Sequence, residues 1–512
     1  MERYDVLIAG AGPTGLVLAL WLAHQGVKVG IVDKAAQPGT TSRAMAVHAR
    51  TLELYRQLGL ADETIAAGKR NVAVNMWVKG KRRAHLSLED AGARLTPYPF
   101  VLVYPQDQHE RLLLRHLERA GVQVQRPVEL VDIEDREDYV VARLRDPDGG
   151  LRECEARFLA GCDGASSTVR QKLGAGFPGG TYDHIFYVAD VQARGVAADG
   201  EVHVSLETAD FVLMLPYTDT GRGRLIGTVR DGPGTGTGHP SFDDVSHRAL
   251  DSLGLQVDQV HWFSTYRVHH RVSNHYRSGQ VFLVGDAAHV HSPAGGQGMN
   301  TGIGDAVNLA WKLAAVVRHE APDSLLDSYE IERLAFARKL VDTTDRLFSF
   351  ITAEGNVADF MRTRIAPLFA SVAYGIDTVR EQIFRIISQI TINYHDSPLS
   401  IGSAGAIKAG DRLPWVEIDG IDNHAPLQKI DWQVQAYGEA GDGLRAWCLL
   451  HAMPMREFAW SQAHEDAGFV RNAHYLVRPD GHVALCALCD PSAGPDAIAH
   501  YFRDRAYRRF CS

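Results

Sequence analysis

Three segments of the chain share one order of hydrophobic and polar positions: a short apolar run, a glycine-containing turn with an acid, and a run with helical spacing. They cover residues 5–33, 157–170 and 281–317. Short continuous apolar runs are typical of strands buried on both faces, and apolar positions three and four residues apart are typical of helices. The chain is therefore predicted to repeat a strand-turn-helix unit. In open α/β sheets, ligands bind at such turns.

The first turn, within residues 5–33, carries a glycine fingerprint. Gly10 permits a tight turn, Gly12 lets the backbone approach a pyrophosphate, and Gly15 lets the helix pack close to the strand. The N–H groups at the start of the helix favour a phosphate. Asp33 ends the next strand, where it can accept hydrogen bonds from ribose hydroxyls. The segment predicts a dinucleotide site but does not separate NAD from FAD.

The two later turns decide between these dinucleotides. Residues 157–170 place Asp163 between a strand and a helix opened by a serine, and residues 285–300, GDAAHVHSPAGGQGMN, follow another strand. A simple NAD domain has no use for further acidic turns, whereas FAD continues beyond the pyrophosphate into a ribityl chain and a ring. Asp286 is placed to bind ribityl hydroxyls, and the backbone of 295–299 can lie against the ring. We therefore expect FAD.

Alternating apolar and polar positions mark the middle of the chain. Segments within 180–268, such as EVHVSL, FVLMLPY and GRLIGTV, predict an antiparallel sheet, which together with about 72–100 would cover a substrate. Apolar positions of FVLMLPY are candidates for the pocket lining, although an alternating apolar face is more often simply core. These candidates are Phe211, Leu213, Met214 and Tyr217.

After about residue 345 the pattern changes. Helical spacing in 346–395 predicts amphipathic helices that pack on the main body or on a partner subunit. AGDRLP at 409–414 opens a new region. There LRAWCLLH reads as a strand, the stretch after Met455 as a helix, and YLVRPDGHVAL as a hairpin that turns at 479–481.

Composition narrows the class of protein. The 512 residues, 45% of them hydrophobic, can fill more than one core and predict two or three domains. A net charge of −9 without a long basic run argues against a nucleic-acid partner or an anionic membrane surface. No export or membrane segment is visible, because the apolar run at 16–23 is too short to span a bilayer. Six cysteines in so long a chain make no disulfide framework, which favours the reducing cytoplasm.

Two groups of residues admit another interpretation. His289 and His291, near Asp286, could share a face as metal ligands. No further histidine or cysteine stands at a ligand-like spacing, so no metal is expected. Cys486 and Cys489 would point to opposite faces of a continuing strand, which does not suit redox chemistry.

Three separated motifs occur in order: GAGPTG at 10–15, CDGASSTVR at 162–170 and GDAAHVHSPAGGQGMN at 285–300. Together they resemble the signatures of the class A flavoprotein aromatic hydroxylases, the para-hydroxybenzoate hydroxylase-like group. The match covers residues 1 to about 345. TSRAMAVHARTLELYRQLGL at 41–60 and VYPQDQHERLL at 103–113 are also similar to segments of this family.

The resemblance implies one set of residues around FAD. Thr14 and Asp33 would hold the adenosine side, and Asp163 would serve both cofactor and reductant. Arg43, near the flavin, and Pro293, on the reactive face of the ring, are the implied catalytic positions. The implied cofactor-binding residues are Gly10, Gly12, Thr14, Gly15, Asp33, Arg43, Gln106, Asp163, Asp286, Gly296, Gly298, Met299 and Asn300. The family more often has glutamate at the position of Asp33. Asp107 also reads as a helix N-cap, with Glu110 three residues on.

The resemblance also implies the architecture, an α/β fold. A Rossmann-like FAD-binding domain of residues 1–71, 101–179 and 269–345 would carry an inserted mixed β-sheet substrate domain of 72–100 and 180–268. A helical connector of 346–400 and a thioredoxin-like carboxy-terminal domain of 401–512 would follow. A thioredoxin carries its cysteine pair where this chain reads AMPM at 452–455. The tail is therefore expected to be structural, and a homodimer is left open.

The implied activity is that of a single-component monooxygenase. NADPH or NADH would reduce FAD, and the reduced ring would take up O2 as a C4a-hydroperoxide. Its distal oxygen would pass to a phenolic or polycyclic aromatic substrate. The pocket must be dry, because water would release hydrogen peroxide. The same scaffold admits a dehydrogenase, an epoxidase or a Baeyer–Villiger enzyme, and a non-catalytic flavin-binding module is the alternative from another class.

Overall fold

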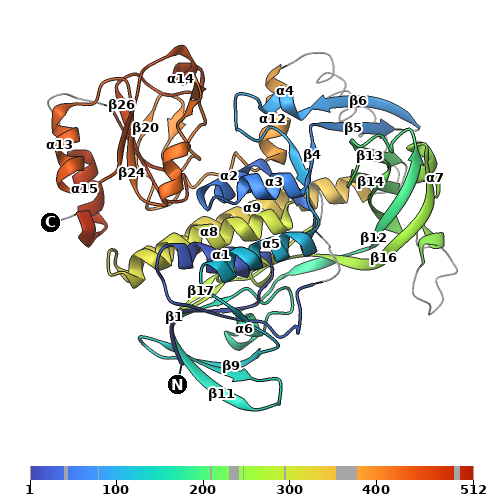
Figure 1. Ribbon diagram of the computed structural model, residues 1–512, viewed down its shortest axis with the longest axis horizontal. Helices are drawn as coiled ribbons and strands as arrows, with labels where there is room; N and C mark the ends of the chain where they lie inside the picture. The colour runs from blue at the N-terminus through green and yellow to red at the C-terminus, as the bar shows by residue number, and fades with distance from the viewer. Residues whose placement is uncertain are drawn as a thin grey trace.

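Two eight-stranded sheets and a four-stranded sheet organise the chain (Figure 1). This computed structural model describes residues 2–39, 44–78, 80–207, 210–229, 241–245, 247–292, 296–352, 377–488 and 496–510. Helices fill the space between the sheets. The tail lies at one end of the central helices, and the second eight-stranded sheet lies at the other (Figure 1). The expected α/β fold is confirmed.

The first eight-stranded sheet brings the three predicted turns to one edge. Its main path runs β17-β18-β11-β1-β2-β8, in which neighbours from β18 to β8 are parallel. Ala9 pairs with both Val32 and Gly161, and Gly161 pairs with Leu283, so the strands before the turns end at one level. The strands are β1 (Glu2–Ala9), β2 (Val29–Val32), β8 (Val124–Gln125), β9 (Glu129–Asp135), β10 (Val140–Arg145), β11 (Leu151–Gly161), β17 (Arg277–Ser278) and β18 (Val281–Leu283).

Three helices pack beside this sheet: α1 (Pro13–His24), α5 (Gln106–Arg119) and α8 (Gly298–Val317). Almost all of α8 is buried, because it packs on α1 and also contacts α2 (Ala49–Gln57) and α9 (Asp327–Thr352). The predicted cap of α5 is wrong. Pro105 takes the N-cap position, so Asp107 falls in the first turn and pairs with Arg111 at 3.1 Å.

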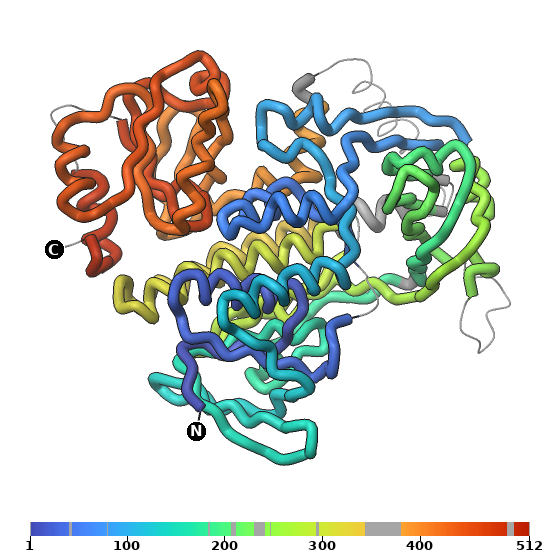
Figure 2. The backbone as a smooth tube through the Cα atoms, viewed as in Figure 1, coloured from blue at the N-terminus to red at the C-terminus, as the bar shows by residue number. Residues whose placement is uncertain are grey.

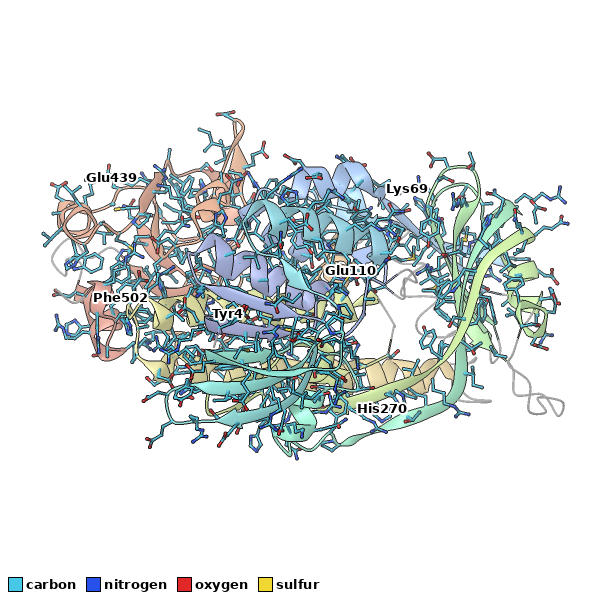
Figure 3. The ribbon with its side chains drawn as sticks, turned by 60° about the horizontal axis from the view of Figure 1, so that its bottom comes forward. Tyr4, Lys69, Glu110, His270, Glu439 and Phe502 are labelled. Atoms are coloured by element: carbon cyan, nitrogen blue, oxygen red, sulfur yellow. The ribbon has the colours of Figure 1, made fainter. Side chains whose placement is uncertain are left out.

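The second eight-stranded sheet has the order β19-β16-β12-β15-β14-β13-β5-β6 and is mostly antiparallel, as the alternating pattern predicts. Its strands are β5 (Ala73–Val78), β6 (Lys81–Ser87), β12 (Gly179–Gly195), β13 (Val202–Glu207), β14 (Asp210–Pro216), β15 (Arg222–Val229), β16 (Leu255–Val272) and β19 (His289–Val290). The two longest strands, β12 and β16, connect the sheet to the body, and His270 marks that junction (Figure 3). Both strands cross the expected domain boundaries, which remain predictions.

Smaller elements join the two sheets. A three-stranded sheet, β3 (Ala46–Val47), β7 (Val101–Val103) and β4 (Lys69–Asn71), lies between them. The short helices are α3 (Ala61–Ala67), α4 (Leu88–Gly92), α6 (Thr168–Lys172) and α7 (His247–Ser252). Of the helices predicted in 346–395, the structure describes the end of α9 and α12 (Asp377–Ile387). No described helix is both long enough and apolar enough to cross a membrane.

The tail forms its own sheet, coloured orange to red in Figure 2. Its strands run β25-β24-β26-β27, with β24 and β25 parallel and the other pairs antiparallel. They are β24 (Gln433–Tyr437), β25 (Met455–Phe458), β26 (Ala473–Val477) and β27 (Val483–Leu488). The hairpin predicted around 479–481 is confirmed, since β26 and β27 flank that turn.

One tail prediction is wrong. The segment LRAWCLLH lies in a helix, α13 (Asp442–Leu450), because Leu444, Trp447 and Cys448 are buried at helical spacing while the following leucines are exposed. After Met455 the chain first forms the strand β25, and a short helix, α14 (Gln462–Asp466), follows it. The first strand of this sheet is therefore β24, and residues 438–441 after it contain no cysteine. The helices α14 and α15 (Asp496–Asp504) complete the tail.

Candidate active site

The first glycine turn combines two tight contacts with one open surface. A Cβ atom on Gly10, whose φ is 101°, would lie 2.3 Å from the carbonyl oxygen of Cys162. A Cβ atom on Gly15 would lie 2.0 Å from the carbonyl oxygen of Gly10. At Gly12 nothing lies within 4 Å of that position. Gly12 caps α1 without a side-chain hydrogen bond, and the first turn of α1 has no acidic residue, so its N–H groups suit an anion.

An open cavity of about 660 Å³ lies over this turn. It is lined by Ala9, Gly10, Gly12, Val32, Asp33, Lys34, Val128, Glu129, Leu130, Cys162, Asp163, Gly164 and Thr168. The first two glycine turns and the end of β2 therefore border one space, as the sequence predicts for the adenosine half of a dinucleotide.

Asp33 also holds the local backbone. Its carboxylate accepts hydrogen bonds from the amides of Ala11 and Ala35, each at 2.7 Å, and lies 3.4 Å from the guanidinium of Arg126. Arg126 donates to the carbonyl oxygen of Ala11 at 3.1 Å. Sequence reasoning missed Arg126, which precedes a proline and belongs to no glycine motif.

The second turn leaves one buried oxygen without a partner. Asp163 accepts a hydrogen bond from the Val169 amide at 3.1 Å through Oδ2, but its buried Oδ1 has no hydrogen-bond partner. Ser167 caps α6, as the sequence predicts for a serine here, through a 2.9 Å bond from the Arg170 amide. A buried carboxylate oxygen is costly to leave unpaired, so Asp163 suits a ligand that donates a hydrogen bond.

The third turn packs directly against the first. A Cβ atom on Gly285 would lie 2.7 Å from Oγ1 of Thr14, and one on Gly302 would lie 2.4 Å from the same oxygen. Thr14 is thus enclosed by the turn and by α8. Asp286 lies in the 3-10 turn Gly285–Ala287 and is exposed.

Asp305 secures this third turn from inside α8. Its Oδ2 accepts hydrogen bonds from the Gly285 amide at 3.1 Å and from Nε2 of His289 at 2.7 Å, and its Oδ1 accepts one from Nε of Arg333 at 2.5 Å. Burial opposes its ionisation, but the charges of Arg333 and His289 outweigh burial and hold the pKa of Asp305 below its usual value. The sequence signal was an acid inside an otherwise apolar helix.

The two histidines of this turn each have one hydrogen-bonded ring nitrogen, while Nδ1 of His289 and Nε2 of His291 are buried without a hydrogen-bond partner, so the expectation that no metal binds here stays a prediction. Nε2 of His289 is hydrogen-bonded to Asp305, and His291 donates from Nδ1 to the carbonyl oxygen of Ser292 at 2.9 Å. Burial lowers the pKa of His291 to about 4, with the neighbouring His289 adding to the effect. Each histidine therefore has a structural partner.

A second group in the described chain brings possible metal-binding atoms together: Asp199, Glu201 and His203 each place one within 4.8 Å of the others. The indole N–H of Trp77 donates to Nδ1 of His203 at 2.9 Å, which leaves the proton on Nε2. That proton is donated to Asp199 at 2.8 Å. Binding a cation at Nε2 would break this arrangement.

Asn300 holds the chain near the predicted ring site. Its Oδ1 accepts hydrogen bonds from the His48 amide at 2.9 Å and from Oγ1 of Thr51 at 2.8 Å. Its Nδ2 donates to the carbonyl oxygens of Ala46 at 2.8 Å and Gly296 at 2.9 Å. The side chain is fully occupied by the protein, so only the backbone of Asn300 remains to face a ring.

Gln106 has a similar anchoring role. Its Oε1 accepts a hydrogen bond from the Ala44 amide at 3.2 Å, and its Nε2 donates to Glu110 at 2.8 Å. Glu110 lies on α5 (Figure 3), and burial raises the pKa of its carboxyl group. Both predicted catalytic residues, Arg43 and Pro293, lie outside the described residues.

The remaining ring-side candidates lie at the start of α8. Gly298 begins the helix, and nothing lies within 4 Å of the position a Cβ atom would take. A Cβ atom on Gly296 would lie 2.9 Å from that of Ala46. Met299 is partly buried and packs against the core. The backbone here is open on the Gly298 side and closely packed on the Gly296 side.

The four predicted substrate residues divide between two faces of β14. Leu213 and Tyr217 pack with a cluster that includes Met45 and Val103 of the small sheet, toward the glycine turns. Met214 is buried on the opposite face, in the cluster under α7. Strand alternation places Phe211 with Leu213. Met214 is therefore a core residue, and its prediction as pocket lining is corrected.

The same face of the sheet carries an ion pair that sequence reasoning missed. Arg224, 1% exposed, donates to Asp190 from Nε at 2.7 Å and from Nη2 at 2.9 Å. Tyr217 donates its hydroxyl to Asp190 at 2.7 Å, and the Arg224 guanidinium lies 5.4 Å from the ring centre of Trp262. Burial, together with the Asp190 charge, raises the pKa of Tyr217. The available sequence signals were two charged residues in segments predicted to form the sheet: the arginine of GRLIGTV and the aspartate at position 190.

Comparisons with known proteins agree with this geometry. The family model described as "FAD binding domain" matches residues 3–344. The chain is 38% identical to 6-methylpretetramide 4-monooxygenase of Streptomyces rimosus, over 83% of this chain and 76% of that protein. It is 33% identical to pentachlorophenol 4-monooxygenase of Sphingobium chlorophenolicum, over 81% and 76% of the two chains. Among solved structures, anhydrotetracycline hydroxylase from Streptomyces rimosus has a TM-score of 0.77 at 28% identity, covering 98% of this chain and 99% of that one.

Proposed function

This chain belongs to the FAD-binding domain family and is an FAD-dependent monooxygenase of the aromatic hydroxylase type, and from this premise we propose that it hydroxylates a phenolic or polycyclic aromatic compound. NADPH or NADH is the reductant, and O2 is the second substrate. The observation that carries the proposal is the convergence of three distant turns, Gly10 against Cys162 and Thr14 against Gly285. The three named relatives all act on compounds with aromatic rings.

The described residues fit FAD. Gly10, Gly12 and Gly15 provide the pyrophosphate turn, with Thr14 behind it and Asp33 at the ribose. Asp163, with its unpaired buried oxygen, accepts a hydrogen bond from the cofactor. Asp286, exposed at the third turn, binds the ribityl hydroxyls. The backbone of Gly296, Gly298, Met299 and Asn300, together with Gln106, would hold the ring, and the roles of Arg43 and Pro293, outside the described residues, stay as the family resemblance implies them.

When bound, FAD supplies a ring that can accept a hydride from the reductant and activate O2 for transfer of one oxygen atom. The chain supplies a site for the aromatic ring. Leu213 and Tyr217 offer an apolar face, and Asp190, whose side chain is 27% exposed, offers a fixed acceptor to a phenolic hydroxyl. Arg224 fixes the Asp190 carboxylate in place, and a hydrogen bond to that carboxylate would orient the phenolic hydroxyl.

Purified protein loaded with FAD tests this function. Oxidation of NADPH or NADH should speed up when a simple phenol, a quinone or a polycyclic aromatic polyketide is added. The product should gain one oxygen atom, labelled when the reaction runs under ¹⁸O2. A dehydrogenase would add no labelled oxygen, while an epoxidase or a Baeyer–Villiger enzyme would give an epoxide or an ester. A non-catalytic flavin-binding module would neither speed up reductant oxidation nor form product.

The tail and the assembly complete the proposal. The strand order β25-β24-β26-β27, with one parallel pair, supports a thioredoxin-like domain, and the lack of cysteine at 438–441 supports a structural role for it. We also propose that the protein forms a homodimer and is located in the cytoplasm. Light scattering of the purified protein tests the homodimer.

A further inference from the structure

The hairpin turn of the tail inserts a charged group into the body of the protein. Arg478 is fully buried and donates to Glu332 of α9 at 2.7 and 3.0 Å. It also donates to Asp480 at 3.1 and 2.5 Å. Asp480 in turn accepts the indole N–H of Trp311, on α8, at 3.2 Å. The turn between β26 and β27 is therefore fixed to both α8 and α9.

Glu332 is the point where the tail meets α9. Besides Arg478, it accepts hydrogen bonds from Lys312 at 2.8 Å, Asn308 at 2.6 Å and Ser397 at 2.6 Å. Its side chain is fully buried. Loss of Arg478 would leave the buried Glu332 carboxylate with Lys312 as its remaining cation and without two of its hydrogen bonds, so the position of α9 depends on the tail.

The next residue of α9, Arg333, bonds to an earlier part of α8. Arg333 donates to Asp305 at 2.5 Å and to the carbonyl oxygen of Thr301 at 3.1 Å. It also donates to the hydroxyl of Tyr394 at 2.9 Å, and the ring of Tyr394 lies 5.2 Å from the Arg478 guanidinium. Arg333 of α9 and Arg478 of the tail therefore share Tyr394 as a neighbour.

Asp305 then reaches the third glycine turn through the Gly285 amide and His289. Five buried residues thus form a series, which we call the buried charge chain: Asp480, Arg478, Glu332, Arg333 and Asp305. Ion pairs join its neighbours except Glu332 and Arg333, which are consecutive residues of α9. We propose that the carboxy-terminal domain positions the cofactor-binding turn of 283–291 through the buried charge chain. This inference rests on the proposed placement of FAD at Asp286.

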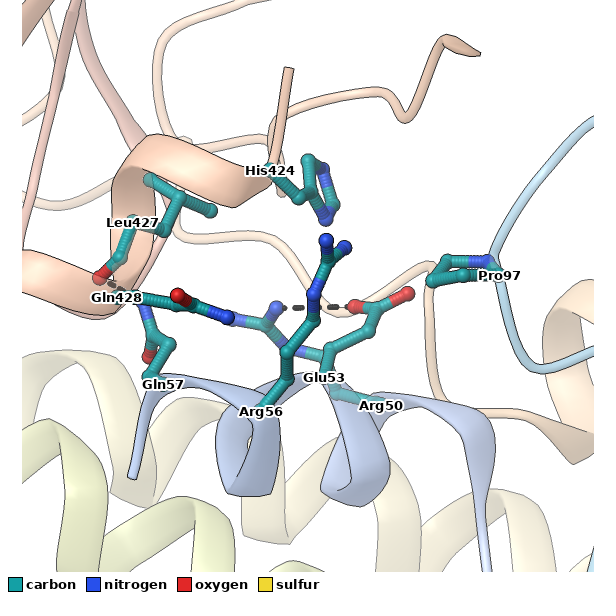
Figure 4. A pocket seen from close by; sticks show the side chains of 8 residues that line it. All are labelled: Arg50, Glu53, Arg56, Gln57, Pro97, His424, Leu427 and Gln428. Carbon is teal, nitrogen blue, oxygen red and sulfur yellow. Dashed lines mark hydrogen bonds and ion pairs between the residues drawn. The ribbon is translucent and has the colours of Figure 1, made fainter. Parts of the chain in front are cut away.

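The interface between tail and body offers a matched control. Arg412 of the tail, also buried, donates to Glu53 of α2 at 2.8 Å, and Glu53 pairs with Arg50 at 3.1 Å. Figure 4 shows Arg50 and Glu53 on α2, facing His424 of the tail. Arg412 joins the same two parts of the chain, but it contacts none of the five residues of the buried charge chain.

Hydrogen exchange on the FAD-free protein tests the positioning role without relying on the cofactor. In Arg478→Met we expect amide exchange in 283–291 to accelerate about 5- to 30-fold, because the Gly285 amide loses a fixed acceptor. Arg412→Met should lower Tm but leave exchange in 283–291 at the wild-type rate. If Arg478→Met does not fold, Arg478→Lys should give a smaller acceleration in the same direction. Unchanged exchange in the Arg478 variants, or equal acceleration in Arg412→Met, would overturn the proposal.

FAD titration provides the second readout. Arg478→Met and Arg333→Met should each raise the FAD dissociation constant about 5- to 30-fold, and the double variant should raise it by less than the product of the two. Multiplicative effects would contradict a single chain of contacts. A wild-type protein that takes up no FAD would instead contradict the proposed function, and the exchange measurement would still decide this inference.

Discussion

Oγ1 of Thr14 occupies the space that a side chain on Gly302 would need, since a Cβ atom there would lie only 2.4 Å away. The start of α1 and the first turns of α8 can touch only because position 302 is glycine. We expect Gly302→Ala to destabilise the protein by about 1–3 kcal/mol, the usual cost of overpacking, and to weaken FAD uptake. Thermal unfolding and the flavin content of the purified protein measure the two effects.

A second substitution tests whether the contact with Thr14 is the reason that position 302 requires glycine. Thr14→Ala removes the oxygen that the new Cβ atom would meet at 2.4 Å. The double variant Thr14→Ala with Gly302→Ala should therefore unfold at a higher temperature than Gly302→Ala alone. A double variant no more stable than the single one would show that the contact with Thr14 is not what requires glycine.

We expect Asp163 to strengthen FAD binding without stabilising the FAD-free protein. Its Oδ1 is buried without a hydrogen-bond partner, while Oδ2 accepts the Val169 amide. In Asp163→Asn the amide oxygen can keep the Val169 bond, and the negative charge on the unpaired side disappears. We expect the FAD-free variant to unfold at the wild-type temperature or above it, while the rise in Tm on adding FAD becomes smaller. A lower Tm without FAD, with normal FAD binding, would assign Asp163 a structural role.

The strands before the three turns were predictable because each is a continuous apolar run, and only a central parallel sheet buries such runs on both faces. The parallel pairing of β1 with β11 and of β11 with β18 follows. The glycines could also be predicted, since Gly15 is required by a contact within its own motif and the φ of Gly10, 101°, favours glycine. Local sequence patterns therefore predict these strands and the glycines of the turns.

Contacts between distant segments could not be read in the same way. Asn300 was predicted to contact the ring, yet its side chain is bonded to residues more than two hundred positions earlier. Asp305, Arg333 and Arg224 acquire their roles from partners that no sequence pattern specifies. Met214 illustrates a related limit, because alternation along β14 shows that two faces exist but not which one faces the glycine turns.

The error at LRAWCLLH has a separate physical cause. LRAWCLLH is apolar enough for a buried strand and also has apolar residues at helical spacing, and the run is too short to separate the two by length. Burial of Leu444, Trp447 and Cys448, with Leu449 and Leu450 exposed, decides for a helix. Only the packing of the tail sheet supplies that information.

Neighbouring residues on β14 permit a sharp test of the substrate face. Leu213→Ala and Tyr217→Phe should each raise KM for the aromatic substrate several-fold without changing FAD affinity, because both side chains lie on the face toward the glycine turns. Met214→Ala should instead lower stability by about 2–5 kcal/mol through a core cavity and leave KM unchanged. Steady-state kinetics and thermal unfolding separate the outcomes. A raised KM in Met214→Ala, with normal KM in the other two, would reverse the assignment of faces.

Protonation of Glu53 should account for part of the loss of folding stability at low pH. Burial disfavours its charge, but Arg412 and Arg50 outweigh burial and lower the pKa of Glu53 from 4.5 to about 2. A carboxyl group with a depressed pKa stabilises the folded state above its unfolded pKa, and that stabilisation is lost as pH falls through the folded value. The lowering corresponds to about 3 kcal/mol, present above pH 4.5 and lost between about pH 4.5 and 2.

Glu53→Gln removes this titration and leaves Arg412 and Arg50 without their carboxylate. The variant should be less stable than the wild type at pH 7, and the difference should shrink as pH falls below about 4.5, because the wild-type residue itself becomes protonated. Urea unfolding at several pH values between 3 and 7 measures the difference. Exposed Glu89→Gln serves as the control and should track the wild type throughout. A difference between Glu53→Gln and wild type that stays constant over this range would mean that Glu53 contributes through packing and not through its charge.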